Sequence, residues 1–272
     1  MVSKDFGEKV KKNVAGNFDE SLAAYQAFEE KRGFFRALAL RLAEAIDLRP
    51  GTDVLDVGCG NGVSALALNE TFGCRVLGVD LSPKMIAAGQ KACDAGQVEL
   101  VKGDGERLLE AARGRTFDYV LYNAAIFIFP DVDRTLAEAS ACLRPGGTIA
   151  FSFYPYLAGP AGEDLLDAAF ESIGKPPPKF RVITDYDKAC DALARHCGTV
   201  RHHRWVRPLD IDFLKDFFSI PAQSASLFPG LSYGQRLAQV QRLFEGIAHL
   251  SDKGETHGAG RIVWRMAQAR RE

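Results

Sequence analysis

Val54-Leu55-Asp56-Val57-Gly58-Cys59-Gly60-Asn61-Gly62 is the stretch that decides the fold of this chain. The apolar residues around Asp56 have the character of a buried parallel strand. The glycines that follow permit positive φ angles and let a ligand approach the main chain closely. The helix expected from Val63 onwards offers unpaired N–H groups and a partial positive charge at its start. The stretch therefore predicts one wall of a ligand crevice, with the Asp56 carboxylate at its edge.

The segment 52–153 continues this strand-and-helix alternation. Strands are expected at 53–57, 75–79, 98–102, 117–122 and 148–154, with helices near 63–71, 83–93, 106–113 and 131–142. Such alternation predicts an α/β fold in which a parallel, Rossmann-like sheet has helices on both faces. Right-handed crossovers place the carboxyl ends of the strands on one edge, where ligands collect.

The glycine turn by itself is compatible with two cofactors. Gly60-x-Gly62-x-x-Ala65, with Asp80 about 20 residues further on, also meets the dinucleotide fingerprint, so a nicotinamide-dependent oxidoreductase is one alternative. Three later motifs follow the glycine turn along the chain. They are Asp80 after the second strand, Gly103-Asp104 after the third, and Leu143-Arg144-Pro145-Gly146-Gly147 before the fifth. In this order and spacing, the chain resembles the class I S-adenosylmethionine-dependent methyltransferases over about residues 50–155.

The resemblance implies a seven-stranded sheet whose last strand is antiparallel, and S-adenosylmethionine bound at its carboxyl edge. Asp80 would accept hydrogen bonds from both ribose hydroxyls and Asp104 one from the adenine amino group, with Leu81 and Met85 at the ring faces. Helix core is the alternative for Met85. Ser82 is expected to cap the following helix, which leaves Asp80 free for this role. The cofactor-binding residues expected on this basis are Asp56, Gly58, Cys59, Gly60, Asp80, Leu81, Met85, Gly103, Asp104, Gly105, Asn123, Ala124 and Tyr25.

Residues 1–272 are predicted to form a single methyltransferase domain, with a Rossmann-like core at 49–208 and 259–272. Residues 1–48 supply N-terminal helices, one opening at Asn17 and one over 34–46. Helices placed here often close over the cofactor in the family, so Tyr25 and Phe28 are lid candidates, with simple packing as the alternative.

Between the expected sixth (199–207) and seventh (260–267) strands lies an insertion, 209–258. It is predicted to hold helices at 210–218 and 233–250, joined by a loop at 219–230. Because insertions at scaffold edges commonly bind substrates, we interpret it as a helical cap over the active site, with additional core as the alternative for its many aromatic rings.

The chemistry implied by the family is in-line displacement of an activated methyl group, giving S-adenosylhomocysteine. Positioning of this kind contributes roughly 7–11 kcal/mol, and a base is required only for a poorly acidic nucleophile. Tyr154, after the fifth strand, and His257, in a glycine-rich loop, are the catalytic candidates; Tyr156, His202 and His203 are weaker ones. Adjacent His202 and His203 would point to opposite faces of a strand.

Composition favours a small-molecule acceptor over a protein or a nucleic acid. The formal net charge is -1, and no basic, aromatic-interleaved surface suggests nucleic acid. Asn123-Ala124-Ala125-Ile126 also lacks the Asn/Asp-Pro-Pro-aromatic tetrapeptide of relatives that methylate exocyclic amino groups. The longest apolar run, 119–129, is too short for a membrane span, and no signal peptide is apparent.

The 6 cysteines include no CxxC pair, so reduced thiols in a cytoplasmic protein without a metal site are expected. The sequence thus predicts a cytoplasmic small-molecule methyltransferase. A non-catalytic S-adenosylmethionine sensor or partner subunit is the second alternative.

Overall fold

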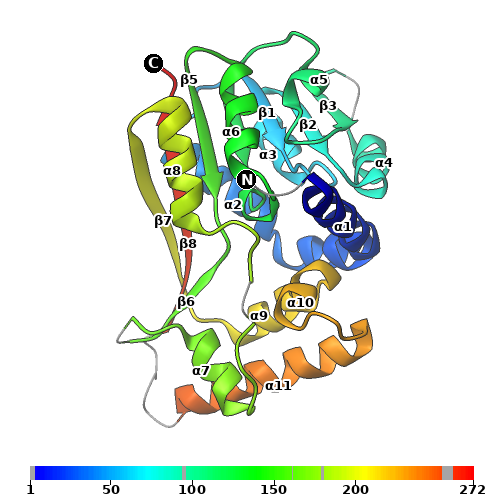
Figure 1. Ribbon diagram of the computed structural model, residues 1–272, viewed down its shortest axis with the longest axis vertical. Helices are drawn as coiled ribbons and strands as arrows, with labels where there is room; N and C mark the ends of the chain where they lie inside the picture. The colour runs from blue at the N-terminus through cyan, green and yellow to red at the C-terminus, as the bar shows by residue number, and fades with distance from the viewer. Residues whose placement is uncertain (1–3, 94–95, 161, 179–180, 253–259) are drawn as a thin grey trace.

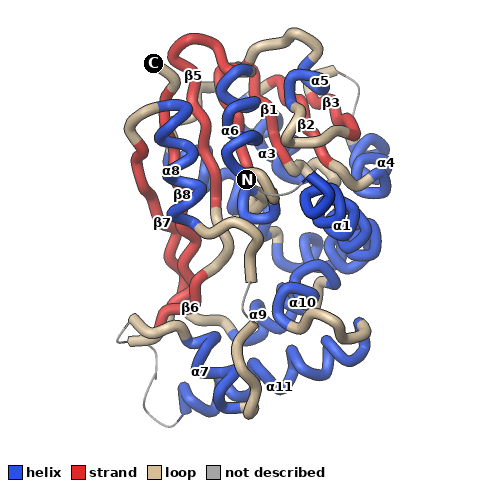
Figure 2. The backbone as a smooth tube through the Cα atoms, viewed as in Figure 1, coloured by secondary structure: helices blue, strands red, loops and turns tan. Residues whose placement is uncertain are grey.

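The computed structural model describes residues 4–93, 96–160, 162–178, 181–252 and 260–272, which form one sheet with helices around it (Figures 1 and 2). The strand order is β3-β2-β1-β4-β5-β8-β6, with β7 paired to the other side of β8. The strands are β1 (Asp53–Val57), β2 (Arg75–Asp80), β3 (Val98–Lys102), β4 (Phe117–Tyr122), β5 (Leu143–Ser152), β6 (Tyr156–Ala158), β7 (Val200–Pro208) and β8 (Arg261–Arg270).

Strands β1 to β5 are parallel, and β8 is antiparallel to all three of its neighbours. Val54, Leu55 and Val57 are completely buried. Helices α6 (Val132–Ala141) and α8 (Tyr186–Cys197) cover one face of the sheet, and α2 (Phe34–Ala45) and α3 (Val63–Phe72) cover the other (Figure 1). Helices α4 (Pro83–Ala92) and α5 (Leu108–Ala112) complete the crossovers. The prediction of a mostly parallel, Rossmann-like sheet with helices on both faces is confirmed.

The sheet has one strand more than the seven expected. After β5 the chain pairs a second time with β8, through the short strand β6, in which Tyr156 lies opposite Val263. The pairing with β5 occupies only the later part of β8, from Met266 to Arg270. The earlier part of β8 would otherwise leave main-chain groups unpaired on that side, and β6 supplies their partners.

The N-terminal helix begins earlier than expected. Helix α1 runs from Lys4 to Arg32, not from Asn17, and Gly33, with φ of 56°, separates it from α2. Phe6, Val10 and Val14 follow one another at the i, i+4 spacing of a helix face. The glycines within this stretch weaken its helical signal, so packing against the body decides the outcome.

A second helical layer lies beyond the carboxyl edge of the sheet (Figures 1 and 2). It contains α7 (Leu165–Ser172), α9 (Ile211–Phe218), α10 (Pro221–Leu227) and α11 (Tyr233–Asp252). The prediction of a loop over 219–230 is wrong in its middle, where α10 forms. Pro221 suits the first turn of a helix, and Ser21 on α1 accepts a hydrogen bond from the Ala222 N–H at 2.9 Å, so tertiary contact stabilises a segment of weak propensity.

Aromatic rings join the second layer to the N-terminal helices. The Phe28 ring centroid lies 5.7 Å from that of Phe213 and 5.8 Å from that of Phe217, and Phe34 lies 5.1 Å from Phe213. All four rings are buried. Phe28 is therefore a core residue, not part of a lid, and the rings of α9 serve as the additional core that was the alternative to substrate recognition.

Candidate functional site

The turn after β1 forms the floor of a cleft at the carboxyl edge. Gly58 has a φ of 73°, and its N–H donates to the Val79 carbonyl at 2.8 Å. A Cβ at Gly58 would lie 2.6 Å from the Ala125 Cβ, whereas a Cβ at Gly60, with φ of 54°, would meet no protein atom within 4 Å. Position 58 therefore needs glycine, both for its positive φ and because a side chain would clash with Ala125. Gly60 leaves room above the main chain for a ligand.

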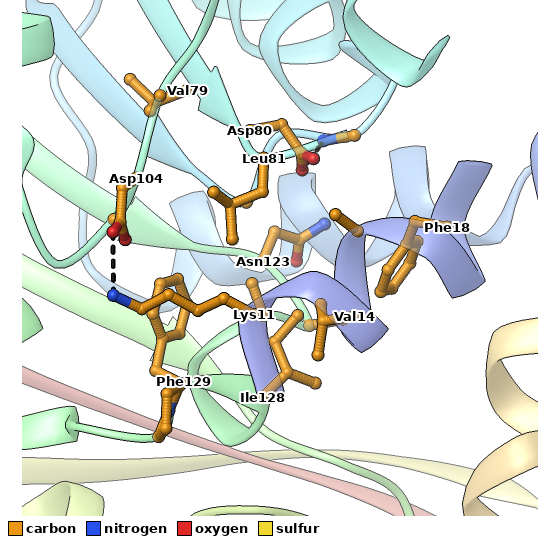
Figure 3. Close-up of a pocket in the computed structure, with 18 of the residues that line it drawn as sticks. Lys11, Val14, Phe18, Val79, Asp80, Leu81, Asp104, Asn123, Ile128 and Phe129 are labelled. Atoms are coloured by element: carbon orange, nitrogen blue, oxygen red, sulfur yellow. Dashed lines mark hydrogen bonds and ion pairs between the residues drawn. The ribbon is translucent and has the colours of Figure 1, made fainter. Parts of the chain in front are cut away.

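The cleft encloses about 830 Å³ of empty space, counting the part that opens to solvent. Figure 3 shows α1 lying across it, with Asp80, Asp104 and Asn123 projecting from the strand ends. The expected cofactor residues that line it are Tyr25, Gly58, Gly60, Asp80, Leu81, Gly103, Asp104, Gly105, Asn123 and Ala124. Asp56, Cys59 and Met85 do not line it.

Asp80 connects the two loops that begin the cleft. One of its carboxylate oxygens accepts from the Gly60 N–H at 2.9 Å and the other from the Ser82 N–H at 2.8 Å. Burial raises the pKa of Asp80, while these main-chain donors favour its charge. Ser82 caps α4 by accepting from the Met85 N–H at 3.1 Å, so the predicted cap is confirmed. Asp80 is left to face the cleft.

Asp56 lies below the cleft and is 1% exposed. Among the described residues, its Oδ2 atom is one of a few buried polar side-chain atoms without a hydrogen-bond partner. Burial and the negative charge of Asp80 raise the pKa of Asp56 to about 7. A buried acceptor without a donor is energetically costly, and a cationic ligand group would relieve this cost.

Lys11, which the sequence did not single out, crosses the far end of the cleft from α1. Its Nζ lies 2.8 Å from Asp104 Oδ2 and 2.5 Å from Glu106 Oε2, and its side chain is 11% exposed. Figure 3 shows Lys11 directed at Asp104. Burial opposes the charge on Lys11, but the hydrogen bonds to the two carboxylates outweigh it and raise the pKa of Lys11. The apolar residues at helical spacing around Lys11 are the signal that could have identified it.

Tyr25 and Asn123 line the middle of the cleft. Tyr25 stacks on Phe35, with ring centroids 4.4 Å apart, and burial raises the pKa of Tyr25 well above its usual value. The Asn123 amide donates to the Phe35 carbonyl at 3.1 Å and to Ser64 Oγ at 2.8 Å, and its oxygen accepts from Ser152 Oγ at 3.0 Å. The Asn123 side chain is thus engaged within the protein, which leaves the main chain for a ligand.

Two expected cofactor contacts differ from the prediction. Met85 is completely buried on α4 and does not reach the cleft where an adenine face was expected. Cys59 turns its sulfur toward β2, since a Cβ added at Gly78 would lie 2.8 Å from Cys59 Sγ. Both side chains are buried beneath the loops that form the cleft, because they pack into the apolar core under those loops.

The catalytic candidates are distributed around the molecule. Tyr154 is buried, and its hydroxyl lies 3.3 Å from Ser226 Oγ on α10. His257 lies outside the residues that the structure describes. His202 Nδ1 lies 2.9 Å from the Tyr186 hydroxyl and His203 Nε2 lies 3.0 Å from Gln268 Nε2. The two histidines therefore have different partners and neither reaches the cleft; Tyr156, whose hydroxyl donates to the Gly162 carbonyl, does not reach it either.

A second cavity of about 1,270 Å³, counting its open part, adjoins the first. Tyr154 lines it, together with residues of α1, α10 and the segment after β4. The residues that line both cavities are Val14, Phe18, Ala124, Ile128, Pro130 and Gln223. The molecule thus offers two adjoining compartments, one with carboxylates and exposed main chain, the other mainly apolar.

The first compartment fits S-adenosylmethionine. Asp80 offers acceptor oxygens suited to ribose hydroxyls, and Asp104 offers another acceptor. The unpartnered oxygen of Asp56 does not line the compartment but lies buried on the strand that leads into its glycine turn. The open space above Gly60 admits a ligand against the main chain.

Comparison with known proteins gives the same class. Residues 55–151 match the family model described as "Methyltransferase domain". The chain is 34% identical over 140 residues to nocamycin O-methyltransferase of Saccharothrix syringae, covering 50% of this chain and 49% of that protein. It is 32% identical over 154 residues to aklanonic acid methyltransferase of Streptomyces sp. (strain C5), covering 55% of this chain and 68% of that protein.

A solved structure shares the fold: the S-adenosylmethionine-dependent methyltransferase from Thiobacillus denitrificans, in complex with S-adenosyl-L-homocysteine. It has a TM-score of 0.52 and 17% identity, and the match covers 86% of this chain and 91% of that one. The chain belongs to the class I S-adenosylmethionine-dependent methyltransferases, and S-adenosylmethionine is its cofactor. This decides between the two cofactors that the glycine turn allowed. The sequence match spans about half the length of the nocamycin enzyme.

Two further observations concern partners. No helix in the described part of the chain is long and apolar enough to cross a membrane. Among the same residues, no group of three or more histidine, cysteine, aspartate or glutamate side chains is arranged to hold a metal ion.

Proposed function

We propose that this protein transfers the methyl group of S-adenosylmethionine to a small-molecule acceptor held in the second cavity. The observation that supports this most directly is the adjoining pair of compartments, which share six lining residues. The names of the two curated relatives, which are methyltransferases of nocamycin and aklanonic acid, also favour a small-molecule acceptor.

In this proposal the acids and the glycine turn at the carboxyl edge have defined tasks. The cofactor supplies a methyl group already activated on a sulfonium. Asp80 holds the ribose hydroxyls and Asp104 the adenine amino group, while the main chain of Gly58, Gly60 and Ala124 faces the rest of the molecule. Asp56 takes the ammonium group. The protein contributes positioning, which is worth roughly 7–11 kcal/mol in well-aligned reactions.

The organisation of the domain follows the same division. We propose that, within residues 1–48, helix α1 covers the cofactor and that the insertion 209–258 forms the cap of the acceptor cavity. Helix α1 supplies Val14 and Phe18 to both compartments, and α10 supplies Ala225 and Ser226 to the second. All 6 cysteines are free thiols, which supports a reducing, cytoplasmic setting.

The test is calorimetric titration of the protein with S-adenosylmethionine. Asp80→Asn should weaken binding about tenfold or more, because an amide replaces a charged acceptor for two hydroxyls. Asp187→Asn, an exposed change on α8, is the matched control and should bind like the unmodified protein. Equal affinity of all three proteins would contradict the ribose assignment. Release of S-adenosylhomocysteine with an added acceptor distinguishes an enzyme from a sensor.

A further inference from the structure

The second cavity has apolar walls that continue out to the surface. Val14, Phe18 and Phe127 line its interior. Phe6 and Ile183 also line it, yet they are 55% and 41% exposed. Large apolar side chains at the mouth of a cavity mark a binding surface for an apolar ligand.

The polar side chains in this cavity are poorly suited to accept a proton. Burial raises the pKa of Tyr154, so its hydroxyl, which contacts Ser226, remains protonated and acts only as a hydrogen-bonding group. Arg181 forms ion pairs with Asp164 and Asp167. None of the described residues that line this cavity is a histidine, aspartate, glutamate or lysine.

The charged side chains that line the adjoining compartment are engaged as well. Asp104 is paired with Lys11, whose raised pKa keeps it protonated. Asp80 accepts hydrogen bonds from the main-chain N–H groups of Gly60 and Ser82. An acceptor in the second cavity therefore faces no described lining group that is placed to remove its proton.

We infer that the acceptor is a mainly apolar molecule bearing a phenolate or enolate that is already ionised when it binds. This inference rests on the proposed methyl transfer. Its oxygen electron pair forms the bond to the methyl carbon. The carbon–sulfur bond breaks with its electron pair on sulfur, and no proton moves. The negative acceptor and the positive sulfonium become two neutral products, so the apolar surroundings strengthen the attraction that brings them together. An aliphatic alcohol would need a base, and the described residues of these walls supply none.

Three naphthalene probes test this inference with S-adenosylmethionine saturating at every pH: 1-nitro-2-naphthol, ionised at neutral pH; 2-naphthol, ionised only in alkali; and 2-naphthalenemethanol, which does not ionise. Methylated product and S-adenosylhomocysteine are measured by mass spectrometry. For each naphthol, kcat/KM should rise roughly tenfold per pH unit and level off at that probe's own pKa. A common midpoint for both naphthols, or comparable methylation of the alcohol, would reveal a protein base and overturn the inference.

Binding gives a readout that does not depend on turnover. Ala225 lines the cavity on α10, and Ala225→Asp and Ala225→Asn add nearly equal volume but differ in charge. With S-adenosylhomocysteine bound, the aspartate variant should bind 1-nitro-2-naphthol about tenfold more weakly than the asparagine variant, because like charges repel. Equal affinities, or no binding of either naphthol to protein that binds S-adenosylmethionine, would overturn the inference. Failure to bind S-adenosylmethionine itself would instead refute the proposed function.

Discussion

Replacing Asp56 with asparagine tests whether this buried carboxyl is the partner of the cofactor's ammonium group. The pKa of Asp56 is about 7 in the folded protein, against about 3.9 in an unfolded chain. Without cofactor, the protonated form therefore stabilises the fold below about pH 4, and this contribution is lost as the pH rises through 7. A cationic partner requires the ionised form, so its binding should improve over the same interval.

The size of the effect follows from the ionised fraction. That fraction is about 1% at pH 5 and about 50% at pH 7, so affinity should rise roughly 50-fold, or about 2.3 kcal/mol. At pH 6, binding should release close to one proton, which calorimetry in buffers of different ionisation enthalpy measures directly. Asp56→Asn should bind more weakly and without this pH dependence, while Asp187→Asn should keep it. The same pH slope in protein with and without Asp56, or no proton release, would refute the reasoning.

Further substitutions test α1 and the glycine turn. Lys11→Met leaves the buried Glu106 and the partly buried Asp104 without their cation. It should lower the free energy of unfolding, measured in urea, by about 1–3 kcal/mol. Lys12→Met, an exposed neighbour, should change little, and equal midpoints for the two variants would contradict the ion-pair role. Gly58→Ala should lower the free energy of unfolding by more than the roughly 1–2 kcal/mol cost of a left-handed residue, because its Cβ meets Ala125. Gly60→Ala should lower the free energy of unfolding by only about 1–2 kcal/mol yet still weaken S-adenosylmethionine binding. If this variant binds S-adenosylmethionine as tightly as the unmodified protein, the cofactor does not lie over this turn.

The carboxyl edge of the sheet was predictable because local and global signals agree there. The buried strand before Gly58, the helix cap at Ser82 and the acids at the ends of β2 and β3 each have a local signature, and parallel topology brings them together. The local conformation of these residues is set mainly by the neighbouring sequence.

The features that the sequence did not predict depend on tertiary contacts. The start of α1 at Lys4 and the pairing of Lys11 with Asp104 join residues 93 apart in the chain, and no local pattern identifies such a partner. Helix α10 forms where Ser21 meets Ala222, against a weak local propensity. Met85 occurs at helical spacing that suits either core or ligand contact, and only the packed structure shows that it faces the core.

The segment between β7 and β8 contributes to the acceptor cavity, whereas the ends of other strands form most of the cofactor site. These strands are antiparallel neighbours, so the connection between them resembles an enlarged hairpin and can lengthen or shrink while both strands stay in register. Strands β1 to β4, whose ends hold the acids and glycines, form no part of that connection. Apart from Gln223, which lines both cavities, residues 209–258 could therefore change to bind new acceptors while the strand ends that hold the methyl donor stay the same.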